Sequence, residues 1–203
     1  ACAVDPERHI IRSKDLGQTW TILPTLNWGW NSSQDVIIHP VDPEIMVAAI
    51  QGPPRWTHFM CRTTDGGQNW SVFGPEETDF YGSGGSDAVH FDSRDPNIIY
   101  VHKIKGDVLW RSTNGGIDWE LTLQDVSGDT DCQSRFVESP WDENTVYVNI
   151  AGVFASRDRG HTWIPTGQLT SSAFYVHPSD SSYLYSASNN QSFFRSTDRG
   201  KTW

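Results

Sequence analysis

Short apolar runs alternate with polar turns along the chain, and no segment shows the 3.6-residue period of an amphipathic helix. In each repeat, a run of four or five residues meets a turn rich in Pro, Asp and Ser. A second run, rich in Ile, Val and Tyr, follows the turn, and a loop then leads to a third run. This pattern predicts an all-β chain of short antiparallel strands, and its clearest examples are residues 35–50, 87–103, 135–149 and 172–187.

The third run of each repeat ends in a segment of nearly constant sequence. The five copies read RSKDLGQTW, RTTDGGQNW, RSTNGGIDW, ASRDRGHTW and RSTDRGKTW, and they end at Trp20, Trp70, Trp119, Trp163 and Trp203. We call the part of each copy from the Ser or Thr to the Trp a box turn. Successive box turns lie 40 to 50 residues apart, and a fourth apolar run follows the first four of them. Four short strands in a repeat of this length are typical of the blades of a β-propeller.

The residues of the box turn have plain structural roles. Its acidic residue can accept hydrogen bonds from the backbone N–H groups of the turn, and the Gly two positions later can adopt a positive φ. The Trp offers a large apolar face that can wedge between neighbouring sheets. The box turns are therefore expected to build the fold and to catalyse nothing, and their acidic positions are Asp15, Asp65, Asn114, Asp158 and Asp198.

These segments resemble the Asp-box (BNR repeat), S/T-x-D-x-G-x-x-W, of sialidases, xyloglucanase-type glycoside hydrolases and Vps10/sortilin receptors. The resemblance covers essentially the whole chain and implies one β-propeller region. Its expected parts are a partial blade at 1–27, holding only the strands before and after the first box turn, and blades at about 28–76, 77–126, 127–169 and 170–203. Because the families resembled have more blades, we expect a longer propeller, completed by the same or another chain. The alternative is a small five-bladed ring, or closure by a second copy.

Composition excludes some classes of protein. The formal net charge of −10, without a cluster of Lys and Arg, argues against nucleic acid as a partner. No apolar run of about 18 residues is present, so no membrane span is expected. Sequons at Asn31, Asn69 and Asn190 favour a secreted, extracellular or cell-envelope protein.

The cysteines and histidines suggest no cofactor. Cys2, Cys61 and Cys132 lack metal-binding spacing; one disulfide with one free thiol is possible, and the pair stays open. Cys61 falls in an expected strand and should be buried. The strand histidines have no facing ligand at metal spacing, so we expect no metal; they are His39, His90, His102 and His177.

The family fold sorts the loops onto two faces. The loops that enter the first strand of each blade, and those that join the second strand to the third, gather on the face opposite the box turns. On this candidate ligand face, aromatic rings beside carboxylates suit sugars, whose C–H faces pack on rings while their hydroxyls take hydrogen bonds. Packing alone could also explain each aromatic residue. The candidate substrate-binding residues are Trp28, Trp30, Arg55, Trp56, Tyr81, Asp129 and Arg135.

Hydrolysis of a glycosidic bond needs two carboxylates, about 5–5.5 Å apart for retention or about 6.5–9.5 Å apart for inversion. Asp35 and Asp87 take the same place in successive repeats, just before the first strand, and Asp131 lies in the next such loop. These three are the candidate catalytic residues, although each could instead cap its loop. Resemblance to xyloglucanases implies acidic residues on such loops, but their catalytic motifs do not match these positions.

A sialidase is disfavoured because most arginines lie in or beside the box turns and only Arg55 and Arg135 fall on the candidate ligand face. The sequence therefore favours an extracellular propeller that recognises a β-glucan or xyloglucan-like polysaccharide and hydrolyses it with paired Asp carboxylates. The alternative is a non-catalytic propeller that binds a protein or peptide, as sortilin-type receptors or assembly factors do.

Overall fold

The computed structural model divides into two compact units, residues 1–105 with 112–119, and residues 106–111 with 120–203. Every element in the described part of the chain is a β-strand, so this part holds no helix that could cross a membrane. The prediction of an all-β chain is confirmed. The structure describes residues 1–7, 9–24, 32–52, 57–75, 89–103, 108–124, 135–150, 152–167, 173–187 and 192–203.

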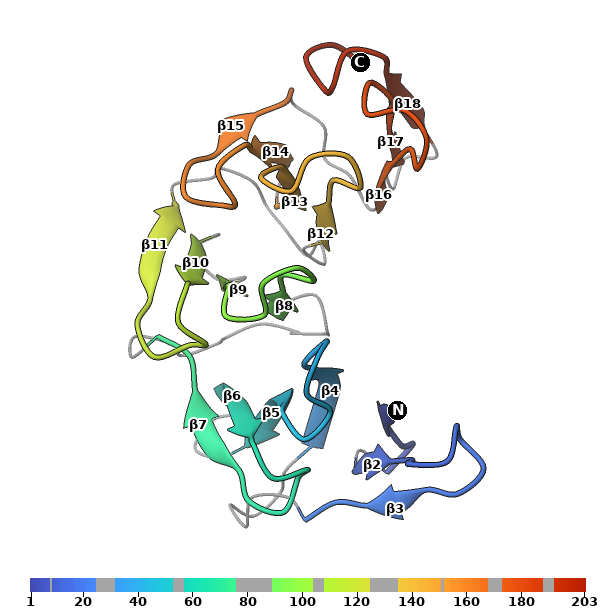
Figure 1. Ribbon diagram of the computed structural model, residues 1–203, viewed down its shortest axis with the longest axis vertical. Helices are drawn as coiled ribbons and strands as arrows, with labels where there is room; N and C mark the ends of the chain where they lie inside the picture. Colours follow the sequence, from blue (N-terminus) through green and yellow to red (C-terminus); the bar gives the residue numbers. More distant parts are fainter. Residues whose placement is uncertain are drawn as a thin grey trace. The chain divides into compact units, whose positions relative to one another are not determined.

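The strands form five sheets in which strand order follows the sequence, as Figure 1 shows. The second and fourth sheets each have four antiparallel strands, as expected for propeller blades. The first sheet holds β1 (Cys2–Val4), β2 (Ile10–Arg12) and β3 (Thr21–Ile22), and the second holds β4 (Ser32–Ile38), β5 (Met46–Gly52), β6 (Thr57–Thr63) and β7 (Ser71–Phe73). The third holds β8 (Val89–Phe91), β9 (Ile99–Lys103), β10 (Val108–Ser112) and β11 (Glu120–Leu123). The fourth holds β12 (Arg135–Glu138), β13 (Val146–Asn149), β14 (Val153–Ser156) and β15 (Ile164–Pro165), and the fifth holds β16 (Ala173–Val176), β17 (Leu184–Ala187) and β18 (Phe193–Ser196).

One expectation about the first sheet is wrong. The sequence predicted two strands there, one on each side of the first box turn, but β1 adds a third strand that pairs with β2 through Cys2↔Arg12 and Val4↔Ile10. The three residues of β1 are too few to show the alternating pattern of a strand. The polar segment that follows them gives no sequence signal for a hairpin. The pairing of β1 with β2 therefore depends on contacts that a local pattern does not report.

The box turns have the hydrogen bonds that their composition predicts. In the second, Asp65 Oδ1 accepts the backbone N–H groups of Asn69 and Gln68 at 2.9 and 3.0 Å. Thr63 donates its hydroxyl to the same carboxylate at 2.8 Å and accepts the N–H of Gly67 at 3.0 Å. The bond from the Asn69 N–H is the main cause that lowers the pKa of Asp65 to about 2, so the turn holds an ionised carboxylate. Gly67 has a φ of 91°, as expected of a glycine position.

The third box turn has the same geometry, but the neutral side chain, Asn114, stands at the Asp position and the carboxylate, Asp118, stands four residues later. Asn114 Oδ1 accepts the N–H of Asp118 at 2.9 Å, and Asn114 Nδ2 donates to Asp118 Oδ2 at 2.7 Å. In the other turns the residue at the place of Asp118 instead donates to the Asp, as Thr162 Oγ1 does to Asp158 Oδ2 at 2.6 Å. The two positions are therefore matched: one side chain donates a hydrogen bond and the other accepts it.

We expect Asn114→Asp to destabilise the protein by about 1 kcal/mol, because two carboxylates would then face each other at contact distance in a solvated turn. The double variant Asn114→Asp with Asp118→Thr should regain wild-type stability, since it recreates the pairing of Asp158 with Thr162. Urea unfolding followed by tryptophan fluorescence measures both. Equal stabilities of the single and double variants would contradict the matched-pair explanation.

Each unit has an apolar core between consecutive sheets. In the first unit, Ile10 and Leu23 pack against Met46, Ala48 and Cys61 of the second sheet. Cys61 is fully buried, as predicted, and burial raises the pKa of its thiol to about 12. In the second unit, Tyr147, Val153 and Ala155 pack against Phe174 and Leu184 of the fifth sheet. In both units the buried contacts therefore join strands of two consecutive sheets, and a box-turn Trp, Trp70 or Trp203, packs against the edge of each cluster.

Candidate functional site

Most residues of the predicted ligand face lie outside the described part of the chain. For two of them, Asp35 and Arg135, the structure describes the backbone but not the side chain. Asp35 lies in β4 opposite Ala49, and Arg135 begins β12 opposite Asn149. Asp35 was expected just before the first strand, and this is wrong: β4 already begins at Ser32, and a register shift separates Ser33 from Asp35. The others remain predictions, namely Trp28, Trp30, Arg55, Trp56, Tyr81, Asp87, Asp129 and Asp131.

A described loop of the first sheet brings together three side chains that the sequence reasoning missed. Asp5, Glu7 and His9 lie between β1 and β2, and one ligating atom of each falls within 4.8 Å of the other two. His9 Nδ1 is 3.1 Å from Asp5 Oδ2 and 3.7 Å from Glu7 Oε2. The N–H of His9 donates to Asp5 Oδ1 and is the main cause that lowers the pKa of Asp5. These residues can offer one nitrogen and two carboxylate oxygens to a divalent cation.

Two of the strand histidines act as turn caps. His39 Nδ1 accepts the N–H of Asp42 at 2.9 Å, and His177 Nδ1 accepts the N–H of Ser179 at 3.1 Å. His102 is buried in β9, and burial lowers its pKa to about 4, which keeps the imidazole neutral. These positions agree with structural roles for the histidines.

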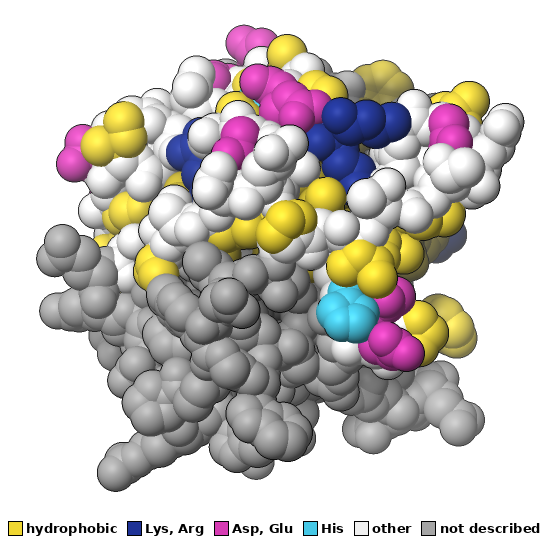
Figure 2. Space-filling model, turned by 90° about the horizontal axis from the view of Figure 1, so that it is seen from below, with side chains coloured by type: hydrophobic (Ala, Val, Ile, Leu, Met, Phe, Trp, Pro, Cys, Tyr) yellow, Lys and Arg dark blue, Asp and Glu magenta, His cyan; other side chains and the backbone are white. Residues whose placement is uncertain are grey.

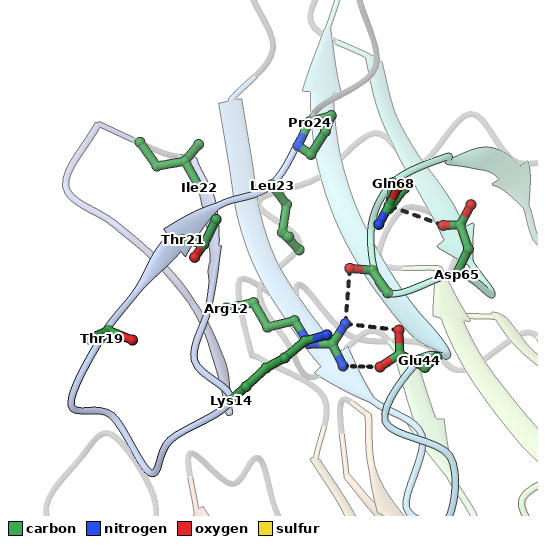
Figure 3. A pocket seen from close by; sticks show the side chains of 11 residues that line it. Arg12, Lys14, Thr19, Thr21, Ile22, Leu23, Pro24, Glu44, Asp65 and Gln68 are labelled. Carbon is green, nitrogen blue, oxygen red and sulfur yellow. Dashed lines mark hydrogen bonds and ion pairs between the residues drawn. The ribbon is translucent and has the colours of Figure 1, made fainter.

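A pocket of about 340 Å³ opens in the first unit beside the first two box turns, where the sequence predicted no ligand site (Figure 3). Residues of the first sheet and its turn form one side, and the turns of the second sheet form the other. Figure 2 shows basic and acidic side chains next to one another, with hydrophobic side chains among them, on the face seen from below. The lining residues are Arg12, Lys14, Thr19, Thr21, Ile22, Leu23, Pro24, Glu44, Asp65, Gly66 and Gln68.

Arg12 and Glu44 form the charged floor of this pocket. Arg12 Nη1 donates to Glu44 Oε2 and to the carbonyl of Gly66, both at 3.1 Å, and Nη2 contacts Glu44 Oε1. Because the guanidinium and the carboxylate hydrogen-bond each other, the pKa of Arg12 is raised and that of Glu44 is lowered. Arg12 is only 9% exposed, so this pair joins the first sheet to the second. Because Arg12 and Glu44 neutralise each other's charge, the pair suits a structural contact better than catalysis.

No protein-family model matches the chain. A xyloglucanase of Acetivibrio thermocellus, Xgh74A, is 26% identical over 205 residues, which cover 92% of this chain and 21% of that protein. The crystal structure of an ancestral GH74 enzyme superimposes with a TM-score of 0.69 and 18% identity over 91% of this chain and 25% of its own. The chain has a GH74-like β-propeller fold.

YCF48 from Cyanidioschyzon merolae has the same fold, with a TM-score of 0.61 and 16% identity over all of this chain and 67% of its own. This GH74-like chain spans about a fifth of the length of the xyloglucanase that it matches. The four-stranded sheets are therefore propeller blades, and the fold by itself is compatible with several activities.

Proposed function

We propose that the chain is part of a secreted glycoside hydrolase that binds and cleaves a xyloglucan-like β-glucan. The observation that carries this proposal is the 26% identity to a xyloglucanase, which extends over 92% of the chain rather than over the box turns alone. The aromatic and acidic composition of the predicted ligand face supports it, because a glucan chain packs its sugar faces on aromatic rings.

In this proposal, the general acid and its partner carboxylate are two of the three candidate catalytic residues, Asp87, Asp131 and Asp35. Trp28, Trp30, Trp56 and Tyr81 form the platform for the glucan chain, and Arg55, Asp129 and Arg135 bind its hydroxyl groups. One carboxyl protonates the glycosidic oxygen, and the other either attacks the anomeric carbon or activates a water molecule. The box turns, with Asp15, Asp65, Asn114, Asp158 and Asp198, contribute only to the fold.

We also infer that the chain forms successive blades of one larger propeller. The five sheets fall one in each of the intervals 1–27, 28–76, 77–126, 127–169 and 170–203. Apolar contacts between the first and second sheets, and between the fourth and fifth, support this inference, because neighbouring blades of a repeat array bury their apolar faces against each other.

Incubation of the purified chain with a panel of polysaccharides tests the activity. We expect release of reducing ends from xyloglucan at least about tenfold faster than from mixed-linkage β-glucan, since the proposed contacts of the ligand face would discriminate between the two glucans by about 1–3 kcal/mol. A sialoside should not be cleaved, because only Arg55 and Arg135 are expected on that face and binding of its carboxylate needs a cluster of arginines. Affinity electrophoresis in gels that contain each glycan measures binding separately. A chain that neither binds nor cleaves any glycan, and that retains a protein or peptide partner during purification, would instead support a non-catalytic binding propeller.

A further inference from the structure

The loop that carries Asp5, Glu7 and His9 has a defined place in the repeat. β1 pairs with β2, which leads into the first box turn, just as β5 pairs with β6, which leads into the second. The loop between β1 and β2 therefore corresponds to the loop between β5 and β6. Loops that join the second strand of a blade to the third are the ones assigned to the predicted ligand face, so the three side chains fall among them.

The hairpin itself brings Asp5 and His9 together. The register of β1 with β2 continues by one pair beyond Val4 and Ile10, because the N–H of Asp5 donates to the carbonyl of His9 at 3.0 Å. The N–H of His9 in turn donates to Asp5 Oδ1 at 2.8 Å. Residues directly opposite each other in an antiparallel pair have their side chains on the same face. The second carboxylate oxygen of Asp5 therefore lies beside the imidazole through bonds that involve only the hairpin.

The distances between the ligating atoms fit one small ion. His9 Nδ1 is 3.1 Å from Asp5 Oδ2 and 3.7 Å from Glu7 Oε2. Tetrahedral zinc bonds of about 2.0–2.2 Å place their ligand atoms about 3.3–3.6 Å apart, so small side-chain adjustments suffice. The side chain of Glu7 is 81% exposed and can make them, while that of Asp5 is only 18% exposed. Within the described ranges, no other group of three His, Cys, Asp or Glu side chains converges in this way.

The charges at this loop favour a cation over a further hydrogen bond. His9 Nδ1 carries at most one proton, so it can donate to only one of the two carboxylates. A cation between the three atoms contacts all of them and offsets both negative charges. Ca²⁺ and Mg²⁺ prefer oxygen ligands throughout, whereas a ring nitrogen suits Zn²⁺ and the neighbouring transition-metal ions. The mixed set of one nitrogen and two oxygens therefore selects a transition-metal ion.

We propose that Asp5, Glu7 and His9 bind a divalent transition-metal ion of the Zn²⁺ type, through Nδ1 of the imidazole and one oxygen of each carboxylate. Three protein ligands leave at least one coordination position for water or for a donor atom of a bound molecule. The site does not depend on the proposed hydrolase activity, because none of the three residues is a candidate catalytic residue. His9 is also not one of the strand histidines, for which no metal was expected.

Isothermal titration calorimetry of the purified, tag-free protein with zinc chloride tests this site. We expect one Zn²⁺ to bind per chain, and Mg²⁺ to bind at least about a hundredfold more weakly. Asp5→Asn, Glu7→Gln and His9→Gln should each raise the dissociation constant for Zn²⁺ at least about tenfold, since loss of even an outer-shell partner costs about 10–100-fold. Asn at position 5 keeps an oxygen that can accept the N–H of His9, so the hairpin should remain intact.

His161→Gln is the matched control. His161 Nδ1 also lies close to a carboxylate, at 3.2 Å from Glu120 Oε1, but the same oxygen accepts a hydrogen bond from Arg111 Nη1 at 2.7 Å. A histidine beside one carboxylate that an arginine already neutralises should not hold the ion. His161→Gln should therefore change the dissociation constant less than about twofold.

Nitrogen NMR of the histidine rings tests the geometry in the wild-type protein, so it is decisive even where a variant fails to fold. Zn²⁺ on Nδ1 fixes the remaining ring proton of His9 on Nε2, and both ring nitrogens should shift accordingly on titration. Absence of Zn²⁺ binding, coordination through Nε2 of His9, or equal affinity for Mg²⁺ would overturn the proposal. Binding that is unchanged in a folded His9→Gln variant would do the same.

Discussion

Replacement of Gly116 by Ala is expected to lower the free energy of unfolding by about 2–4 kcal/mol. Gly116 has a φ of 86°, which a Cβ opposes, and the added methyl group would lie 2.5 Å from Cζ of Phe73 and closer still to Cε2. Phe73 is only 7% exposed and packs edge-on against Trp119 at 5.5 Å between ring centroids. The ring cannot move aside without disturbing the contact between the second sheet and the third box turn.

Gly17 provides the matched control because its φ of 89° is nearly the same, while a Cβ there meets nothing closer than Trp20 at 3.8 Å. Gly17→Ala should therefore cost only the backbone strain, about 1–2 kcal/mol. Chemical denaturation followed by circular dichroism measures both variants. If the two substitutions cost the same, strain alone would account for the effect and packing between the sheets would contribute little.

Replacement of Asp87 or Asp131 by Asn is expected to lower kcat on xyloglucan about a thousandfold while binding is retained. An amide neither protonates the glycosidic oxygen nor acts as a nucleophile or base, yet it keeps the size and most hydrogen bonds of the carboxyl group. Reducing-end assays give kcat, and affinity electrophoresis in xyloglucan gels gives binding.

Asp198→Asn is the control, because this carboxylate belongs to a box turn and accepts the N–H of Thr202 at 2.9 Å. It should leave kcat within about twofold, since Asn114 fills the same role in the third turn. A wild-type rate in both the Asp87→Asn and the Asp131→Asn variants would remove these carboxylates from the proposed mechanism. Loss of binding together with loss of rate would point to a role in holding the glucan.

The features that the sequence predicted are local ones. Asp65 lies within four residues of every backbone group that it binds, so residue types alone report the turn and its repetition. The alternation of apolar runs likewise predicts the strands because a strand exposes its two faces with a period of two. The catalytic assignments to Asp35, Asp87 and Asp131 remain predictions, since no side chain among them belongs to the described part of the structure.

The sequence by itself determined that the chain is all-β, that it repeats, and where its box turns lie, because each of these depends on neighbours a few residues away. Tertiary structure decided the pairing of β1 with β2, the grouping of Asp5 with Glu7 and His9, and the contact of Arg12 with Glu44 and Gly66. Arg12 and Gly66 lie 54 residues apart in the sequence, so their contact depends on which sheet packs against the first, and no local pattern reports it.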